Sequence, residues 1–313
     1  MRRTGLAVLG LAVLACVPFG LNDYQQYIAN LMLVYVVVAV GFNIVLGYIG
    51  QLAFANAAFF GVGAYAAAIA MGRGHLPFLV ALALAALAGG CAGALISLPA
   101  QRLRAYYLAI ATLAFGELLR WTYIHADALT NGSTGLAVPT AYVFAIPLAT
   151  DRAKYYLFLV LTVLVLWSTA NLLASRFGRT LIAVRENEPA AGSVGISPSS
   201  AKVFAFVWSG AVVGVAGAMF AVLLDRISPD SFDLSQLLLH FTIVMIGGLG
   251  SLVGSVAGAV LLTALPELLR DIPGMEEIAF SVLLILILLF LPGGLAGLIE
   301  RVVPWLRDRY FLE

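Results

Sequence analysis

The stretch Arg176-Phe-Gly-Arg-Thr-Leu-Ile-Ala-Val-Arg-Glu-Asn-Glu-Pro-Ala-Ala-Gly-Ser-Val-Gly-Ile-Ser-Pro-Ser-Ser-Ala-Lys202 interrupts an otherwise strongly apolar sequence. Long apolar runs lie on both sides of it, so it is the polar segment around which the rest of the chain is organised. Its charged residues are four cations and two carboxylates: Arg176, Arg179, Arg185, Lys202, Glu186 and Glu188.

This stretch also carries its own helix boundaries. Asn187 or Glu188 can cap a short helix whose first turn contains Pro189, because proline is favoured at the start of a helix. Gly195 can end that helix in a left-handed conformation. Ser197-Pro198 then predicts the N-cap and first residue of the next helix. A short helix held between two membrane spans is well placed to dock onto something outside the membrane.

The composition places the rest of the chain in a lipid bilayer. The 313 residues are 62% hydrophobic and 11% charged, and the mean hydropathy is +1.03. Soluble proteins carry about 25% charged residues, so this chain cannot cover a soluble surface. A net charge of +1 argues against nucleic-acid binding. Cys16 and Cys91 lie in apolar runs and indicate neither a disulfide framework nor a metal site.

Most of the apolar segments approach the roughly 20 residues that cross a bilayer. We therefore predict an all-α polytopic membrane protein, a single transmembrane domain over residues 1–313 with about ten transmembrane helices. The N-terminus resembles a signal peptide, but bulky Leu14 stands where a cleavage site needs a small residue, so we predict a first span there. The predicted spans are 5–21, 27–47, 52–72, 76–98, 106–124, 155–174, 202–224, 237–249, 252–269 and 278–298.

The stretch 237–269 is the ambiguous part of this count, because Gly247-Gly248-Leu249-Gly250-Ser251 breaks it into two short pieces. Either two short helices meet at a tight turn, or one helix crosses and part of the other re-enters. An even number of crossings keeps the basic C-terminal tail on the cytoplasmic side, and this favours two helices.

The distribution of basic residues predicts the orientation. With the N-terminus in the cytoplasm, most arginines and Lys202 fall in cytoplasmic segments, as the positive-inside rule requires. Both termini are then cytoplasmic. The same assignment predicts a cytoplasmic loop at 176–201, an extracytoplasmic loop at 125–154 and a cytoplasmic tail at 299–313.

The sequence lacks the motif of an ATP-binding site. A P-loop needs a lysine that follows glycine and reaches the nucleotide phosphates, but Lys154 and Lys202 both follow alanine. If ATP drives this protein, another chain must supply the ATPase. The three histidines lie in different segments, where each is interpreted as an interface or packing residue rather than a metal ligand: His75, His125 and His240. We also find no nucleophile and base pattern of a hydrolase.

Two groups of polar or small residues in the predicted spans have competing interpretations. Glu117 and Arg120 lie one helical turn apart, so they form either a structural ion pair near the outer boundary or a transport site. Gly47-Tyr48-Ile49-Gly50-Gln51, with Asn56 and Tyr65 beyond it, indicates a span that is easy to break, and broken spans line substrate routes. Close packing of helices on small residues explains the glycines equally well.

Several motifs resemble the permease subunits of branched-chain amino acid ABC importers. They occur in the order found in that family and cover about residues 41–270, and the segments 125–154 and 176–202 resemble the M-type subunit. Asn56 stands where the family commonly has histidine, which leaves the substrate open among branched-chain and other hydrophobic amino acids, urea or amides, and aromatic acids. The matching segments are 47–52, 56–65, 107–115, 130–136, 184–206, 227–232 and 247–251.

The resemblance implies a multi-pass protein of the bacterial inner membrane that works with several partners. These are a second permease subunit in a heterodimer, two cytoplasmic ATPases that bind ATP and Mg²⁺, and an extracytoplasmic substrate-binding protein. The chain itself is then no enzyme and carries no cofactor. A stand-alone secondary transporter or channel is the alternative, supported by the Glu117/Arg120 pair.

The resemblance also assigns roles to individual residues. The loop after the sixth span would hold the coupling helix, whose small residues would sit in a groove on the ATPase. The residues expected to couple to the ATPase are Arg185, Glu186, Glu188, Ala190, Ala191 and Gly195, with the two glutamates facing cations of the partner. The residues expected along the substrate path are Gln51, Asn56, Tyr65, Thr112 and Glu117.

Overall fold

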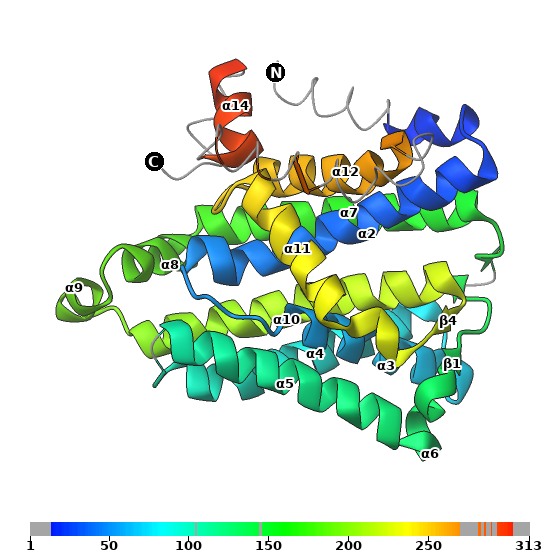
Figure 1. The fold of residues 1–313 in the computed structure, drawn as a ribbon, viewed down its shortest axis with the longest axis horizontal. Helices are drawn as coiled ribbons and strands as arrows, with labels where there is room; N and C mark the ends of the chain where they lie inside the picture. The colour runs from blue at the N-terminus through cyan, green and yellow to red at the C-terminus, as the bar shows by residue number, and fades with distance from the viewer. Residues whose placement is uncertain are drawn as a thin grey trace.

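The protein is described by a computed structural model that covers residues 14–103, 105–143, 146–269 and 293–302, together with residues 281, 282, 285 and 289. Long helices lie side by side along one axis of the molecule (Figure 1). The long helices are α2 (Asp23–Asn43), α3 (Asn56–Gly72), α4 (Phe78–Ala100), α5 (Ala105–His125), α7 (Asp151–Ala174), α10 (Pro198–Leu224), α11 (Leu234–Gly247) and α12 (Leu252–Leu269).

Shorter elements join these helices. A π-helical turn, η2 (Ile44–Tyr48), extends α2, and α8 (Arg176–Glu186) and α9 (Glu188–Ser193) follow α7. The remaining short elements are η1 (Val17–Phe19), α6 (Asp127–Thr130), η3 (Gly132–Thr134), η4 (Pro229–Phe232), α14 (Gly294–Val302), β1 (Leu136–Ala137), β2 (Tyr142–Val143), β3 (Ile146–Pro147) and β4 (Arg226–Ile227).

The helices confirm an all-α polytopic membrane protein. Four of them are long and apolar enough to cross a bilayer: 23–48, 78–100, 151–174 and 198–224. Helices α3, α5, α11 and α12 occupy the positions of four further predicted spans. Large apolar side chains remain exposed on α4, α5 and α7, where lipid can cover them, for example Leu87, Ile110 and Trp167. Most of the predicted spans 5–21 and 278–298 lies outside the described residues.

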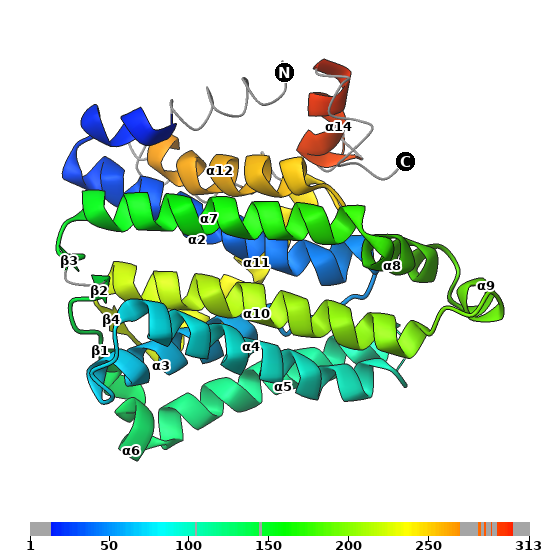
Figure 2. The same ribbon diagram turned by 180° about the vertical axis from the view of Figure 1, so that it is seen from behind.

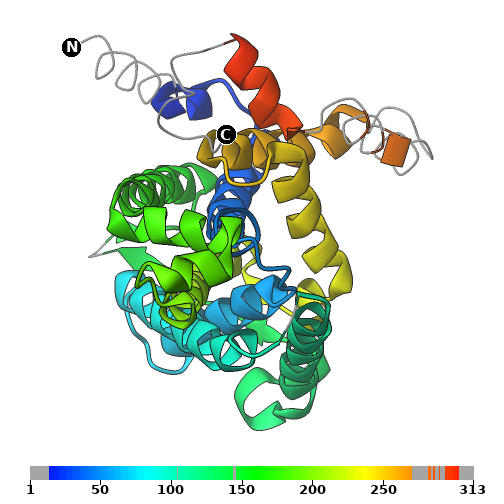
Figure 3. The same ribbon diagram turned by 90° about the vertical axis from the view of Figure 1, so that its left-hand side faces the viewer.

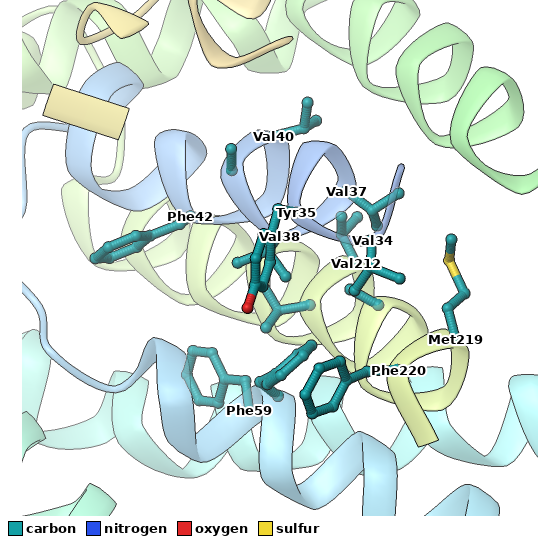
Figure 4. Close-up of a cluster of buried hydrophobic side chains, with 14 of the residues drawn as sticks. Val34, Tyr35, Val37, Val38, Val40, Phe42, Phe59, Val212, Met219 and Phe220 are labelled. Atoms are coloured by element: carbon teal, nitrogen blue, oxygen red, sulfur yellow. The ribbon is translucent and has the colours of Figure 1, made fainter. Parts of the chain in front are cut away.

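Helices α2 and α10 form the centre of the bundle. About 72% of the most apolar part of each is buried, against 33% for α4 and 28% for α7. Figure 2 shows α10 between α7 and α4 on the side opposite to α11. Valines and aromatic side chains of α2 and α10 fill the space between these helices and α3, as Figure 4 shows around Val38, Phe42 and Phe220.

Glycines set the distance between α10 and its neighbours. A side chain on Gly63 would collide with the backbone of Gly214. A side chain on Gly89 would collide with the backbones of Gly210 and Gly214. Backbones can approach this closely only through residues without a side chain. The packing interpretation is therefore correct for Gly63, and Gly47 and Gly50 lie in the broken span that is described below.

The loops gather at two opposite ends of the bundle. At one end lie α8, α9, η2 and the turn Gly248–Ser251; Figure 3 shows the bundle from this side. At the other end, β1 pairs with β4 and η4 contacts α5. The segments found together at each end are the ones that the alternating topology predicts on the same side of the membrane. We call them the α9 end and the β1–β4 end.

Both helices of 237–269 run between these ends. Helix α11 starts next to η4 at the β1–β4 end and reaches the α9 end at Gly247. Helix α12 returns from Ser251, and Tyr24 at the start of α2 donates a hydrogen bond of 2.8 Å to Glu267. This arrangement fits the prediction of two helices that meet at a tight turn.

Candidate functional site

Helix α8 is attached to the membrane-embedded part of the chain. Ser175 caps its start by accepting a hydrogen bond of 3.2 Å from the Phe177 N–H. Leu181 and Val184 are buried against the bundle. Arg185, in the last turn, donates a hydrogen bond of 2.8 Å to the carbonyl oxygen of Gly47. Arg185, which we expected to contact the ATPase, therefore connects α8 to the end of α2.

Helix α9 has the boundaries that the sequence predicts. Asn187 caps its first turn, where the Ala190 N–H donates to Asn187 Oδ1 over 2.9 Å. Gly195 adopts φ +85°, and the Ile196 N–H bonds to the Ala191 carbonyl oxygen, which is the six-residue bond of a Schellman motif. Ser197 caps α10 as predicted.

The two faces of α9 differ sharply. Ala191 is 4% exposed and packs against its own chain, so it holds α9 in place rather than offering a surface. Ala190 and Gly192 are exposed, and the apolar side chain of Val194 is 74% exposed. Helix α9 projects beyond the ends of its neighbours (Figures 1 and 2). The residues of this segment that a partner can reach are therefore Glu188, Pro189, Ala190, Gly192, Ser193, Val194 and Gly195.

An ion pair fastens α9 to α10. Lys202 is 4% exposed, and its Nζ lies 2.8 Å and 3.0 Å from the two carboxylate oxygens of Glu188. Glu188, expected to face cations of the ATPase, thus has a cation within its own chain. Glu186 is exposed and has no ion-pair partner in the part of the chain that the structure describes.

The segment after α2 is a broken span, as the glycines and Gln51 indicate. The helix widens to a π turn over Ile44–Tyr48, and π turns are frequent at functional sites. Gly50 has φ +70°, and a side chain there would press on Arg185. Residues 49–55 then run without helical structure to the start of α3 at Asn56.

Asn43 joins this broken span to the turn between α11 and α12. Its side chain is completely buried; Nδ2 donates to the Ser251 carbonyl oxygen over 3.0 Å, and Oδ1 accepts from the Gly250 N–H over 2.9 Å. Gly47 packs directly on Asn43 and Gly250. The η2 turn is consequently held from two sides, by Arg185 and by the turn at Gly250.

Thr112 supports the non-helical segment rather than standing free. Its Oγ1, buried in α5, accepts a hydrogen bond of 2.7 Å from the Phe54 N–H. Irregular backbone within a bilayer is tolerated only where protein buries it or water reaches it. Gln51 is half-buried in the same segment, and its backbone N–H bonds to the Val45 carbonyl oxygen. Of the predicted path residues, Gln51 therefore belongs to the non-helical segment and Thr112 contacts it from α5.

Asn56 begins a buried polar chain that crosses to α11. Its Nδ2 lies 3.0 Å from His240 Nδ1, and the other ring nitrogen lies 3.0 Å from Gln236 Nε2. Gln236 also contacts the hydroxyl of Tyr35 over 3.1 Å. Amide nitrogens of Asn56 and Gln236 lie at the two ring nitrogens, and because a neutral imidazole accepts at only one of them, only one of these contacts is an N–H donated to the ring. Asn56 Oδ1 is buried and has no partner among the described residues.

Tyr65 lies one layer further toward the β1–β4 end. It stacks on Tyr123 of α5 with ring centroids 4.4 Å apart, and Phe232 lies 5.7 Å from it. Within the described part of the chain neither tyrosine hydroxyl has a hydrogen-bond partner, although both are buried. Gly61 provides the room for Tyr123 and Phe232. Asn56 therefore faces α11, whereas Tyr65, nine residues further along α3, packs on α5 and η4.

Glu117 lies apart from these residues. It forms the expected pair with Arg120 over 3.6 Å and is about half exposed. Arg120 makes the shorter contact of 2.9 Å with Asp230 of η4. At the same end, Lys154 pairs with Asp225 over 3.2 Å. These charges tie helices together at the β1–β4 end, which favours the structural interpretation of Glu117.

Sequence reasoning missed Asn43 and Gln236. It interpreted His240 as a packing residue, and the ring is indeed buried between Tyr35 and Phe60, but its polar contacts were not foreseen. The four-residue spacing of Gln236 and His240 in an apolar helix was the available signal, because such residues share one face. Asn43 gives no such signal, since its partners come from the turn about 200 residues later.

Comparison with known proteins shows the family. A family model described as the permease component of the branched-chain amino acid transport system matches residues 25–292. The high-affinity branched-chain amino acid transport system permease protein LivM of Salmonella typhimurium is 32% identical, over 93% of this chain and 74% of the relative. BraD of Pseudomonas aeruginosa is 29% identical over 88% and 96%, and LivH of Escherichia coli 26% identical over 84% and 91%. No solved structure is matched.

Proposed function

The chain belongs to the family of branched-chain amino acid transport permease components, and we propose that it moves branched-chain or other hydrophobic amino acids across the inner membrane as the M-type subunit of an ATP-driven importer. A second permease subunit, two ATPases and an extracytoplasmic binding protein complete the assembly. The two ATPases bind the ATP and Mg²⁺. The α9 end faces the cytoplasm in this proposal, with both chain termini on that side and about ten spans in all.

The observation that carries this proposal is the geometry of α9. A short helix with small exposed residues projects beyond the bundle, while its capping, its Schellman turn and the Lys202–Glu188 pair hold it in a fixed orientation. We assign α9 as the coupling helix that sits on an ATPase. Ala190, Gly192 and Val194 are its proposed contact residues, because Ala191 is buried and Glu188, although exposed, is already paired with Lys202.

Arg185 gives this helix a mechanical link to the membrane. Movement of α9 displaces α8, and the 2.8 Å hydrogen bond from Arg185 then acts on the Gly47 carbonyl oxygen. The end of α2 carries partial negative charge because its last carbonyls lack helical partners, so the guanidinium is well matched to it. Since η2 continues into the segment before Asn56, ATP-driven movement at α9 reaches the polar chain of Asn56 and His240.

We assign the substrate path to this polar chain and to the aromatic layer beyond it. Gln51, Asn56, Thr112 and Tyr65 belong to the elements that line it, and His240 is a further member. Glu117 is the weakest member of the predicted set, because it lies in the ion-pair cluster at the β1–β4 end.

Copurification and reconstitution test the proposal. The tagged chain, expressed with its partner subunits, should retain ATPase subunits through purification and should transport leucine into liposomes only with ATP and the binding protein. Transport by the isolated chain without ATP would contradict the proposal and would favour a stand-alone transporter. Import of urea or of aromatic acids in place of amino acids would preserve the ABC assembly but contradict the substrate.

A further inference from the structure

We propose that the first turn of α3 is a binding site for the charged end of a free amino acid, with the backbone N–H groups holding its carboxylate and Asn56 Oδ1 accepting from its ammonium group. The proposal rests on the proposed transport function and specifies the ligand class within the membrane path: a zwitterion with an apolar side chain.

The start of α3 lies inside the bundle rather than at its surface. Helix α3 has 17 residues, which is about 25 Å and less than the roughly 30 Å of a bilayer core. Its last residue, Gly72, lies near Pro139 at the β1–β4 end. Its first residue, Asn56, contacts His240 in the middle of α11, a helix that runs from one end of the molecule to the other. The helix therefore begins partway across the membrane.

The first turn of α3 has unused donors. Ala55 occupies the N-cap and has no side chain that can accept a hydrogen bond. Among the described residues, the N–H groups of Asn56, Ala57 and Ala58 have no bonded acceptor. The helix start also carries about half a positive charge. Such a start inside a membrane suits an anionic group, as in the broken helices of transporters.

Asn56 supplies an independent observation. The side chain is 1% exposed, its Nδ2 is taken up by His240, and its Oδ1 has no partner in the described residues. A buried polar atom without a partner is costly, so such an atom is expected to meet a ligand or water. Asn56 is the first residue of α3, so its amide oxygen and the free N–H groups belong to the same helix turn. An amino acid carries its ammonium and carboxylate groups on a single carbon atom, which suits such a pair of groups.

An apolar space lies directly beside these groups. It is a narrow gap without room for a water molecule, lined by Asn56, Ser209 and Ala55 together with Phe42, Phe59 and Phe206. Figure 4 shows Phe42 on α2 and Phe59 on α3 on facing sides. A ligand can therefore enter only after these side chains move apart. Its apolar walls suit an aliphatic side chain.

The wall of this space includes the segment that Arg185 holds. Val45 lies in η2, two residues before Gly47, and lines the space opposite Asn56. A displacement of η2 that opens the space would therefore follow from the same contact that connects α8 to the membrane. This places the amino-acid site within reach of the coupling movement.

Binding of three probes to the complete permease and ATPase complex in nanodiscs, without the binding protein, tests the site. The probes are leucine, 4-methylpentanoate, which lacks the ammonium group, and 3-methylbutylamine, which lacks the carboxylate. Saturation-transfer NMR should detect leucine binding that exceeds that of either analogue by roughly tenfold. Equal signals for leucine and 4-methylpentanoate, or none for leucine, would overturn the inference.

Variants of Asn56 locate the site. Asn56→Leu should weaken leucine binding roughly tenfold or more. Asn56→Asp, which keeps the shape, should shift the preference from leucine toward 3-methylbutylamine because the added negative charge repels a carboxylate. Asn30→Leu is the matched control, since Asn30 is equally buried and also has an unpartnered Oδ1, but it bonds to α7.

The results distinguish a failure of this inference from a failure of the proposed function. Unchanged leucine binding in both Asn56 variants, in a complex that retains its ATPases and hydrolyses ATP, would exclude the site but leave the transport function intact. A chain that retains no ATPase subunit would contradict the proposed function itself.

Discussion

Helices α8 and α9 are adjacent in one polar segment, yet they are built for different tasks. Helix α8 turns Leu181 and Val184 into the bundle and reaches Gly47 through Arg185. Helix α9 buries only Ala191 and exposes most of its remaining surface. The difference indicates that the residues that bind the ATPase, on α9, are not the residues of α8 that transmit its movement to the membrane helices. Variants of the two helices should therefore have separable effects.

The largest effect is expected from Ala190→Arg on the exposed face of α9. An arginine cannot fit a closely packed contact, so we expect binding to weaken by about 2 kcal/mol or more, roughly 30-fold. Copurification of ATPase subunits with the tagged chain measures this, and Ala190→Ser is the control that keeps the small side chain. Normal ATPase recovery with Ala190→Arg would exclude this face as the docking surface.

Arg185→Ala should impair transport rather than ATPase binding, because it removes the hydrogen bond between α8 and the Gly47 carbonyl oxygen. A hydrogen bond to a charged group contributes about 1.5–3 kcal/mol, so the substrate moved per ATP hydrolysed should fall roughly tenfold while ATPase recovery stays normal. The matched control is Arg179→Ala, since Arg179 is exposed on the same helix. Loss of ATPase binding in Arg185→Ala would instead place this residue on the docking surface.

Glu188→Gln tests the fastening of α9 to α10. It leaves the buried ammonium of Lys202 without an opposite charge, and because Glu188 is partly exposed we expect a loss of about 1–2 kcal/mol. Thermal unfolding in detergent should shift down by a few degrees, and ATPase recovery should fall less than for Ala190→Arg. Glu186→Gln is the control, and an equal shift in both variants would argue against the ion pair.

The smallest effect is expected from Gly192→Ala. Gly192 lies within α9 and has open space around it, so the added methyl group should stabilise the helix by at most about 1 kcal/mol. Hydrogen exchange of the α9 amides should slow slightly. Gly195→Ala should act in the opposite direction, because Gly195 needs the left-handed conformation. Faster exchange in Gly192→Ala would show that α9 is not a helix in the complex.

The features that were predicted correctly depend on local backbone chemistry. Asn187, Pro189 and Gly195 set the limits of α9 through their own hydrogen bonds and backbone angles, so the sequence alone shows them. The positions of the long helices follow from runs of apolar residues, which need no knowledge of neighbours. The loops at each end of the bundle are the ones that the distribution of arginines predicts on the same side of the membrane.

The features that were missed depend on contacts between distant segments. Helix α9 is too short for periodicity to distinguish Ala190 from Ala191, so both were assigned to the partner surface. The partners of Arg185, Asn43 and Asn56 lie about 140 to 210 residues away and are fixed only by helix packing. The family resemblance therefore implied external partners for Arg185 and Glu188, whereas both also bond within the chain.

Cross-linking from single cysteines measures the difference between α8 and α9 most directly. After Cys16 and Cys91 are replaced by serine, Val194→Cys on the exposed side of α9 and Arg179→Cys on α8 are compared in membranes that contain the whole importer. We expect Val194→Cys to cross-link to an ATPase subunit, with a yield that changes when ATP is added, and Arg179→Cys to give little product. Cross-links from Arg179→Cys without any from Val194→Cys would contradict the assignment of α9 as the coupling helix.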